Sequence, residues 1–120
     1  MNFSTAIQAH ANWKVRLHSH CRSSSKDVID VPNLAKDNAC ELGKWLHGGS
    51  PKYAADPQFT GLLAEHAAFH RAAAAMATMI GSGKRTEAEA LINSPESEYC
   101  KLSRRVVALL MEFRRKYTDD

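Results

Sequence analysis

Apolar residues recur at helical spacing along most of this chain, and this spacing constrains the fold more than any other feature. The clearest case follows Asp56 and Pro57. Its apolar stripe is Phe59, Leu62, Leu63, His66, Phe69, His70, Ala73, Ala77 and Ile80. A stripe of this width predicts a helix with one side against a core. Two of its members are histidines, whose ring nitrogens need polar partners that an apolar face does not supply.

Four further segments show helical signals. We expect helices over residues 3–17, over 34–47, from 57 to about Gly81, from Thr86 to Asn93, and from Pro95 onward. Asn33 is the expected N-cap of the second helix and Asp56 that of the third, while Thr86 and Glu89 have the spacing of a capping box. No convincing strand is found. The sequence therefore predicts an all-α domain over residues 1–120, a four-helix bundle with one additional short helix.

Composition excludes several classes of protein. The 44% apolar and 24% charged residues are typical of an ordinary globular domain, and the formal net charge is only +3. Lys and Arg are scattered, so we expect no nucleic-acid partner. No apolar run is long enough for a membrane span, and the N-terminus lacks signal-peptide features, so we expect a cytoplasmic protein without membrane insertion. The three cysteines are compatible with reduced thiols or a metal site.

Three histidines and one cysteine are expected on faces that the bundle turns inward. They are His10, Cys40, His66 and His70. Side chains at i and i+4 share a helix face, so His66 and His70 are placed to grip one ion. A thiolate with three neutral imidazoles is a good tetrahedral set for Zn²⁺. The alternative is that each histidine is a core residue satisfied by a carbonyl or water.

The residues around Cys40 help to decide whether it is a metal ligand or an ordinary core residue. A lone buried cysteine is usually a small hydrophobe. However, Gly43 lies one turn further on, where a glycine is costly unless another helix approaches closely. Asp37 could accept the free ring N–H of a ligand histidine, or could simply be solvated near the start of a helix. The aromatic residues expected in the core or in the wall of the site are Trp13, Trp45 and Phe69.

Catalysis is not expected. A zinc peptidase of the His-Glu-x-x-His type needs a glutamate directly after the first histidine, but Ala67 occupies that place and Glu65 precedes His66. Four protein ligands would also leave no open position for a reactive water. A di-iron bundle needs several inward glutamates that are absent here. We therefore predict that the protein is not an enzyme.

Three motifs in this order resemble the chemoreceptor zinc-binding (CZB) domain family. They are "HANW" at 10–13, "CELGKW" at 40–45 and "HAAFH" at 66–70. The resemblance covers most of the chain and implies a helical bundle with His10, Cys40, His66 and His70 as zinc ligands. His18, His20 and Cys21 belong to none of the motifs, and we interpret them first as a solvated helix end and second as an adventitious metal site.

The resemblance also implies a function. Members of the family are cytoplasmic bacterial regulatory modules, usually joined to chemoreceptor or diguanylate cyclase domains, that sense zinc or oxidants such as hypochlorous acid. This chain has no room for such an output, so we expect either a stand-alone member acting on a partner or the sensory part of a longer protein. Cys40 would be the redox-reactive residue. The alternative is a structural or buffering zinc protein.

The resemblance implies a homodimer as well. The last helix carries apolar residues outside its core stripe, namely Cys100, Val107 and Met111. We expect this second flank to supply the surface for pairing.

Overall fold

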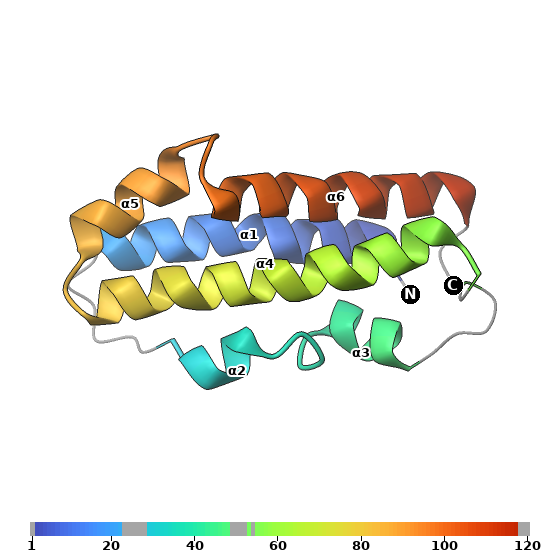
Figure 1. Ribbon diagram of the computed structural model, residues 1–120, viewed down its shortest axis with the longest axis horizontal. Coiled ribbons are helices and arrows are strands. Elements are labelled where there is room, and N and C mark those ends of the chain that lie inside the picture. Colours follow the sequence, from blue (N-terminus) through green and yellow to red (C-terminus); the bar gives the residue numbers. More distant parts are fainter. Residues whose placement is uncertain (1, 23–28, 49–52, 54, 118–120) are drawn as a thin grey trace.

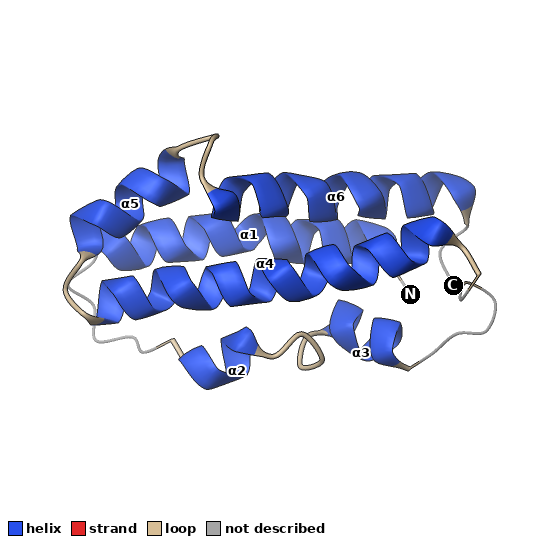
Figure 2. Cartoon of the chain, viewed as in Figure 1, coloured by secondary structure: helices blue, strands red, loops and turns tan. Residues whose placement is uncertain are grey.

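The computed structural model describes residues 2–22, 29–48, 53 and 55–117, and within these ranges every regular element is a helix (Figure 2). The helices are α1 (Phe3–Arg22), α2 (Val31–Ala35), α3 (Glu41–His47), α4 (Pro57–Gly81), α5 (Arg85–Asn93) and α6 (Glu98–Lys116). The predicted all-α class is confirmed.

The three long helices lie side by side along the longest axis of a molecule that measures 45 × 25 × 20 Å (Figure 1). Helices α1 and α4 run in one direction and α6 runs in the other. Helices α2 and α3 return along α4 and together form the fourth side. The short helix α5 lies at the end of the molecule where α1 and α4 finish. The chain is thus an up-down-up-down bundle whose second member is broken.

The predicted helix over 34–47 is wrong in detail, because the segment breaks between Ala35 and Glu41. The carboxylate of Asp30, rather than Asn33, caps α2, and it accepts a hydrogen bond from the Asn33 backbone N–H at 3.1 Å. Aspartate and asparagine side chains compete for backbone hydrogen bonds, and the "KDN" run at 36–38 therefore favours a turn over a helix. As a result Cys40 is not inside a helix but is the N-cap residue of α3.

The predicted N-cap of α4 is confirmed, and the capping box predicted for α5 is wrong. Asp56 caps α4 as predicted, and its Oδ1 accepts from the Gln58 N–H at 2.9 Å. The capping box at Thr86 does not form, because α5 already begins at Arg85 after Lys84. Glu89 instead accepts a hydrogen bond from Arg22 at 2.9 Å. This ion pair ties the end of α1 to α5.

An aromatic cluster fills the core at the end of the molecule where α1 and α4 begin and α6 finishes. Its members are Phe3, Trp45, Tyr53, Phe59, Phe113 and Tyr117. Neighbouring rings lie 4.6–6.3 Å apart, mostly edge to face or tilted, which are the favoured geometries for aromatic pairs. Within the described residues, no helix has the length and apolar character needed to cross a membrane.

Candidate metal centre

Four potential ligand side chains meet near the middle of the bundle. His10 comes from α1, His66 and His70 come from successive turns of α4, and Cys40 comes from the start of α3. One ligand atom of each residue lies within 4.8 Å of the others, and this is the one such group among the described residues. The three histidines are buried and Cys40 is half-buried. The structure therefore brings together the predicted set.

The distances within this group suit a small ion. Cys40 Sγ lies 3.3 Å from His66 Nε2 and 3.5 Å from His70 Nε2, and the two Nε2 atoms are 3.0 Å apart. Tetrahedral zinc with ordinary bond lengths would separate two such nitrogens by about 3.4 Å and a nitrogen from a sulfur by about 3.6 Å. Three of the four corners of a tetrahedral site are thus nearly in place.

Backbone carbonyls orient two of the imidazoles. His10 Nδ1 lies 2.8 Å from the Ala6 carbonyl oxygen, and His70 Nδ1 lies 2.8 Å from that of Leu34. A carbonyl can only accept, so each Nδ1 carries the proton and each Nε2 presents a lone pair. These lone pairs point to the same small volume, the arrangement that outer hydrogen bonds produce around a metal.

Two buried nitrogens in this group have no hydrogen-bond partner among the described residues, namely His10 Nε2 and His66 Nδ1. An unpaired buried polar atom costs free energy, and most such atoms in proteins are satisfied. A cation bound between the four side chains would give His10 Nε2 its partner. This orphaned atom is the observation that best fits a bound metal.

Burial also sets the protonation of the cluster. Burial lowers the pKa of all three histidines below the usual value, and lowers that of His66 to about 3. The imidazoles are therefore neutral at pH 7, which is the form that binds metals. Burial raises the pKa of the Cys40 thiol, against the opposing effect of the Gly43 backbone N–H. A nearby cation would be needed to hold this sulfur as thiolate.

Gly43 serves a purpose other than the predicted close approach of another helix. A Cβ at this position would overlap the backbone carbonyl oxygen of Asp37. The glycine therefore allows the turn before Cys40 to fold back over the first turn of α3. The Gly43 N–H lies 3.3 Å from Cys40 Sγ, so the same fold places a donor on the sulfur.

Asp37 does not contact a ligand histidine as we expected. Its Oδ2 accepts a hydrogen bond from His47 Nε2 at 2.9 Å, and this bond holds the pKa of the Asp37 carboxyl below its usual range. Of the two interpretations that the sequence left open for Asp37, the contact with a ligand histidine is therefore wrong, because the helix over 34–47 does not form. Backbone carbonyls take the role that we had assigned to the carboxylate.

The three aromatic residues of the motifs have different locations. Phe69 lies against the site, with its ring centroid 5.4 Å from that of His10 and 5.6 Å from that of His70. Trp45 lies in the aromatic cluster, 5.5 Å from Phe3. Trp13 is half-buried beneath the guanidinium of Arg16, which lies 4.0 Å from the ring centroid. Only Phe69 is therefore shown as a wall of the site.

The remaining histidine and cysteine side chains near the end of α1 lie outside the site. His18 Nε2 lies 3.7 Å from a Glu89 oxygen, Cys21 is buried in the core, and His20 is half-buried. The expectation of a solvated helix end is wrong for Cys21. This position follows from helical spacing, because Cys21 lies one turn after the buried Leu17.

Sequence reasoning missed three contributions to the site. They are the carbonyls of Ala6 and Leu34 and the side chain of His47. The Ala6 contact could have been found, since the carbonyl at i−4 lies below a helical side chain. The contacts of Leu34 and His47 could not, because both depend on the break between α2 and α3.

These features define a helical-bundle protein with a three-histidine, one-cysteine cluster that can hold a metal ion. The chain matches the family model of the chemoreceptor zinc-binding domain over residues 10–77, which include all four cluster residues, and it belongs to that family. No curated protein and no solved structure is similar enough to this chain to count as a match.

Proposed function

We propose that this protein is a zinc-binding regulatory module in bacterial signalling, in which His10, Cys40, His66 and His70 bind one Zn²⁺ per chain. Family membership and the converging ligand atoms support zinc. The single observation that carries the proposal is the buried His10 Nε2, which has no hydrogen-bond partner among the described residues. Neutral nitrogens and one sulfur are the donors that zinc prefers, while carboxylate-rich sites suit magnesium or calcium.

The sensing step that we propose is oxidation of Cys40. Bound zinc would keep the sulfur as thiolate at neutral pH. The thiolate attacks the oxygen of hypochlorous acid, an S–O bond forms, the O–Cl bond breaks and chloride leaves with the electron pair. The resulting sulfenic acid is a poorer ligand, so Cys40 loosens from the site while the three histidines stay in place.

The positions of the three cysteines support this choice of residue. Cys40 is half-buried, whereas Cys21 and Cys100 are buried. Burial and the neighbouring Glu89 raise the pKa of Cys21, so little of it is thiolate at neutral pH. Oxidants attack thiolates that they can reach. We therefore expect Cys21 and Cys100 to react more slowly than Cys40.

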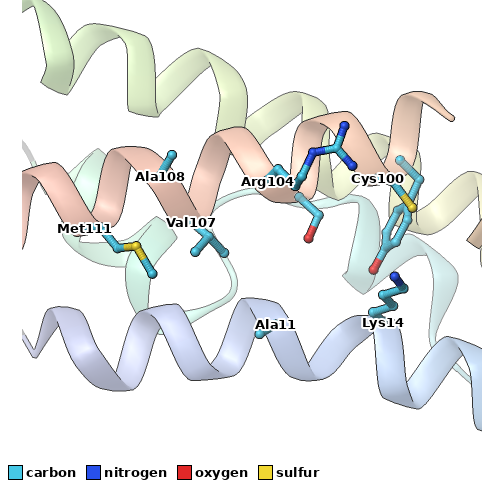
Figure 3. A pocket seen from close by; sticks show the side chains of 9 residues that line it. Ala11, Lys14, Cys100, Arg104, Val107, Ala108 and Met111 are labelled. Carbon is cyan, nitrogen blue, oxygen red and sulfur yellow. The ribbon is translucent and has the colours of Figure 1, made fainter. Parts of the chain in front are cut away.

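The signal would pass to a chemoreceptor or diguanylate cyclase pathway through a partner, with the module paired as a homodimer. A groove of about 430 Å³ lies between α1 and α6 and fits the expected pairing surface. Figure 3 shows Ala11 of α1 opposite the part of α6 that carries Val107, with Lys14 near Cys100 and Met111 toward the other end of the groove. Met111 is 43% exposed, although Cys100 is buried at the floor of the groove. Sedimentation over the micromolar range tests the pairing.

The second candidate function is a structural or buffering zinc protein. The buried cluster also supports it, since four ligands from three segments would tie the bundle together. The two functions differ in the behaviour of the metal-free or oxidised protein. A sensor remains folded in both states and binds its partner differently, whereas a structural site loosens the fold.

Metal analysis of purified variants tests the zinc site. The double variant Cys40→Ala, His66→Ala should lose bound zinc, because two of four donors are removed. A matched control is Cys21→Ala, His20→Ala, which removes the same residue types outside the cluster. Undiminished zinc in the first variant would exclude the site.

Hypochlorous acid below one equivalent, followed by mass-spectrometric mapping, tests the sensing step. Early sulfenic acid on Cys40 with a change in partner binding supports it. Modification of Cys21 or Cys100 with Cys40 spared contradicts it.

A further inference from the structure

One hydrogen bond closes the segment that carries Cys40. His47 at the end of α3 donates from Nε2 to Oδ2 of Asp37, which lies in the turn before α3, at 2.9 Å. Neither residue belongs to the ligand set or contacts it by a hydrogen bond. We propose that Asp37 and His47 form a clamp that positions Cys40 for the metal, an inference that rests on the zinc binding proposed above.

The need for a clamp follows from the shape of this segment. Helix α3 has seven residues, and so short a helix is marginal without outside support. Cys40 precedes it as a cap residue with extended backbone (φ −85°, ψ 165°), so no helical hydrogen bonds fix the sulfur from the other side. The other ligands sit on the long helices α1 and α4. Cys40 is therefore the donor whose position depends most on local contacts.

The clamp acts at both ends of this weak element. The backbone carbonyl of Asp37 packs over Gly43 in the first turn of α3, and the side chain of Asp37 reaches His47 in the last turn. Through these two contacts Asp37 touches both the first and the last turn of α3. The turn with Cys40 at its end then keeps the geometry in which Sγ lies 3.3 Å from His66 Nε2.

The clamp lies at the surface, which separates its effect from the stability of the fold. The side chains of Asp37 and His47 are 28% and 42% exposed. Exposed ion pairs contribute little to the free energy of unfolding, and their removal leaves no cavity. We therefore expect loss of the clamp to change metal binding while the metal-free bundle keeps its unfolding midpoint.

Asp37 has a second property that the test must separate from hydrogen bonding. Its negative charge favours positive charge at His66, and it would equally favour a bound cation. Asparagine keeps the acceptor oxygen and removes the charge. At position 47, glutamine keeps an N–H donor near the place of Nε2 and lacks the ring.

The experiment measures Zn²⁺ affinity by competition with a chromophoric chelator for the wild type, Asp37→Ala, Asp37→Asn, His47→Ala and His47→Gln. The thiolate-to-cobalt absorption of the Co²⁺-loaded proteins reports the Cys40 bond directly. Both alanine variants should lose about 10-fold in affinity, as other residues that orient metal ligands do, with a weaker thiolate band. Asp37→Asn and His47→Gln should recover most of the loss.

The control is Glu112→Ala, which breaks an exposed pair with Arg115 (2.8 Å) within α6, a helix that carries none of the four cluster residues, and it should bind like the wild type. If both alanine variants show the Zn²⁺ affinity and the thiolate-to-cobalt absorption of the wild type, the clamp is overturned and the proposed zinc site stands. Equal loss in Asp37→Asn and Asp37→Ala would also overturn it, since charge would then be the cause. Failure of the wild type to bind either metal would overturn the proposed function and the clamp together.

Discussion

The core has two contrasting regions, the aromatic cluster at one end of the bundle and the histidine–cysteine cluster near its middle. The aromatic rings meet one another edge to face and need nothing further, as between Phe59 and Trp45 at 5.7 Å. The imidazoles also lie edge to face, with His10 and His66 at 5.1 Å, yet two of their buried nitrogens have no hydrogen-bond partner among the described residues. The aromatic region is complete as protein, whereas the histidine–cysteine region has donor atoms arranged so that they could hold a cation.

The short helix α3 contributes to both regions, as the long helices α1 and α4 do. Cys40 at the start of α3 belongs to the metal cluster, and Trp45 near its end belongs to the aromatic cluster. The motif "CELGKW" therefore encodes both an apolar anchor and a ligand. Aromatic packing of Trp45 holds the end of α3 independently of the histidine–cysteine cluster, which fits the proposal that Cys40 can loosen without loss of the fold.

The largest expected effect comes from the aromatic cluster. Phe113 is fully buried and contacts the rings of Phe3, Tyr53, Phe59 and Tyr117. Phe113→Ala should lower the free energy of unfolding by about 3–5 kcal/mol, through lost burial and the cavity left behind. Urea denaturation of the metal-free protein measures the change. Zinc content of the folded variant should stay at the wild-type value, and a loss of zinc would show that the two regions are not separable.

An intermediate effect is expected at Gly43, in the helix α3 that carries Trp45 of the aromatic cluster and follows Cys40 of the metal cluster. Gly43→Ala forces a Cβ against the Asp37 carbonyl, which should cost about 1–3 kcal/mol and displace Cys40, so that zinc affinity falls as well. Gly61→Ala is the matched control. It lies inside α4 with open space around the new Cβ, and should stabilise the protein by about 0.5–1 kcal/mol. Chelator competition and urea denaturation check both variants, and unchanged zinc affinity in Gly43→Ala would contradict the role given to the turn.

The smallest effect concerns pH at the border of the aromatic cluster. Asp56 accepts hydrogen bonds from Lys116 Nζ at 2.8 Å and from the Tyr117 hydroxyl at 2.7 Å, and these contacts lower its pKa to about 2. A lowered pKa contributes stability above the unfolded value near 3.9 that is lost as the pH falls toward 2.

Asp56→Asn should therefore be less stable than the wild type at pH 7, and the difference should shrink between about pH 5 and pH 2. Urea midpoints of the metal-free proteins across this range measure it. Metal-free protein is used so that release of zinc does not contribute. A difference that is independent of pH would mean that the charge of Asp56 does not stabilise the fold.

The histidine–cysteine cluster could be predicted from the sequence because its signals are local. His66 and His70 share a face by spacing alone, and His10 lies on a clear apolar stripe. The bundle follows from the same periodicity. The break before α3 was missed because Leu42 and Leu46 continue the apolar pattern of Leu34 across the turn, which outweighed the turn signal of the "KDN" run at 36–38. Periodicity reports which residues are buried, and it does not report whether the backbone between them is helical.

The ligand residues lie at very different separations along the chain, which affects the order in which the site can assemble. His66 and His70 are four positions apart and meet as soon as α4 forms, whereas His10 and His70 are 60 positions apart. Helical turns form far faster than long loops close. In a newly made chain the two histidines of α4 would therefore be the first pair of the proposed zinc site to come together. Cys40 and His10 would complete the coordination only after the bundle has folded, so full coordination of the metal would be a late step in folding.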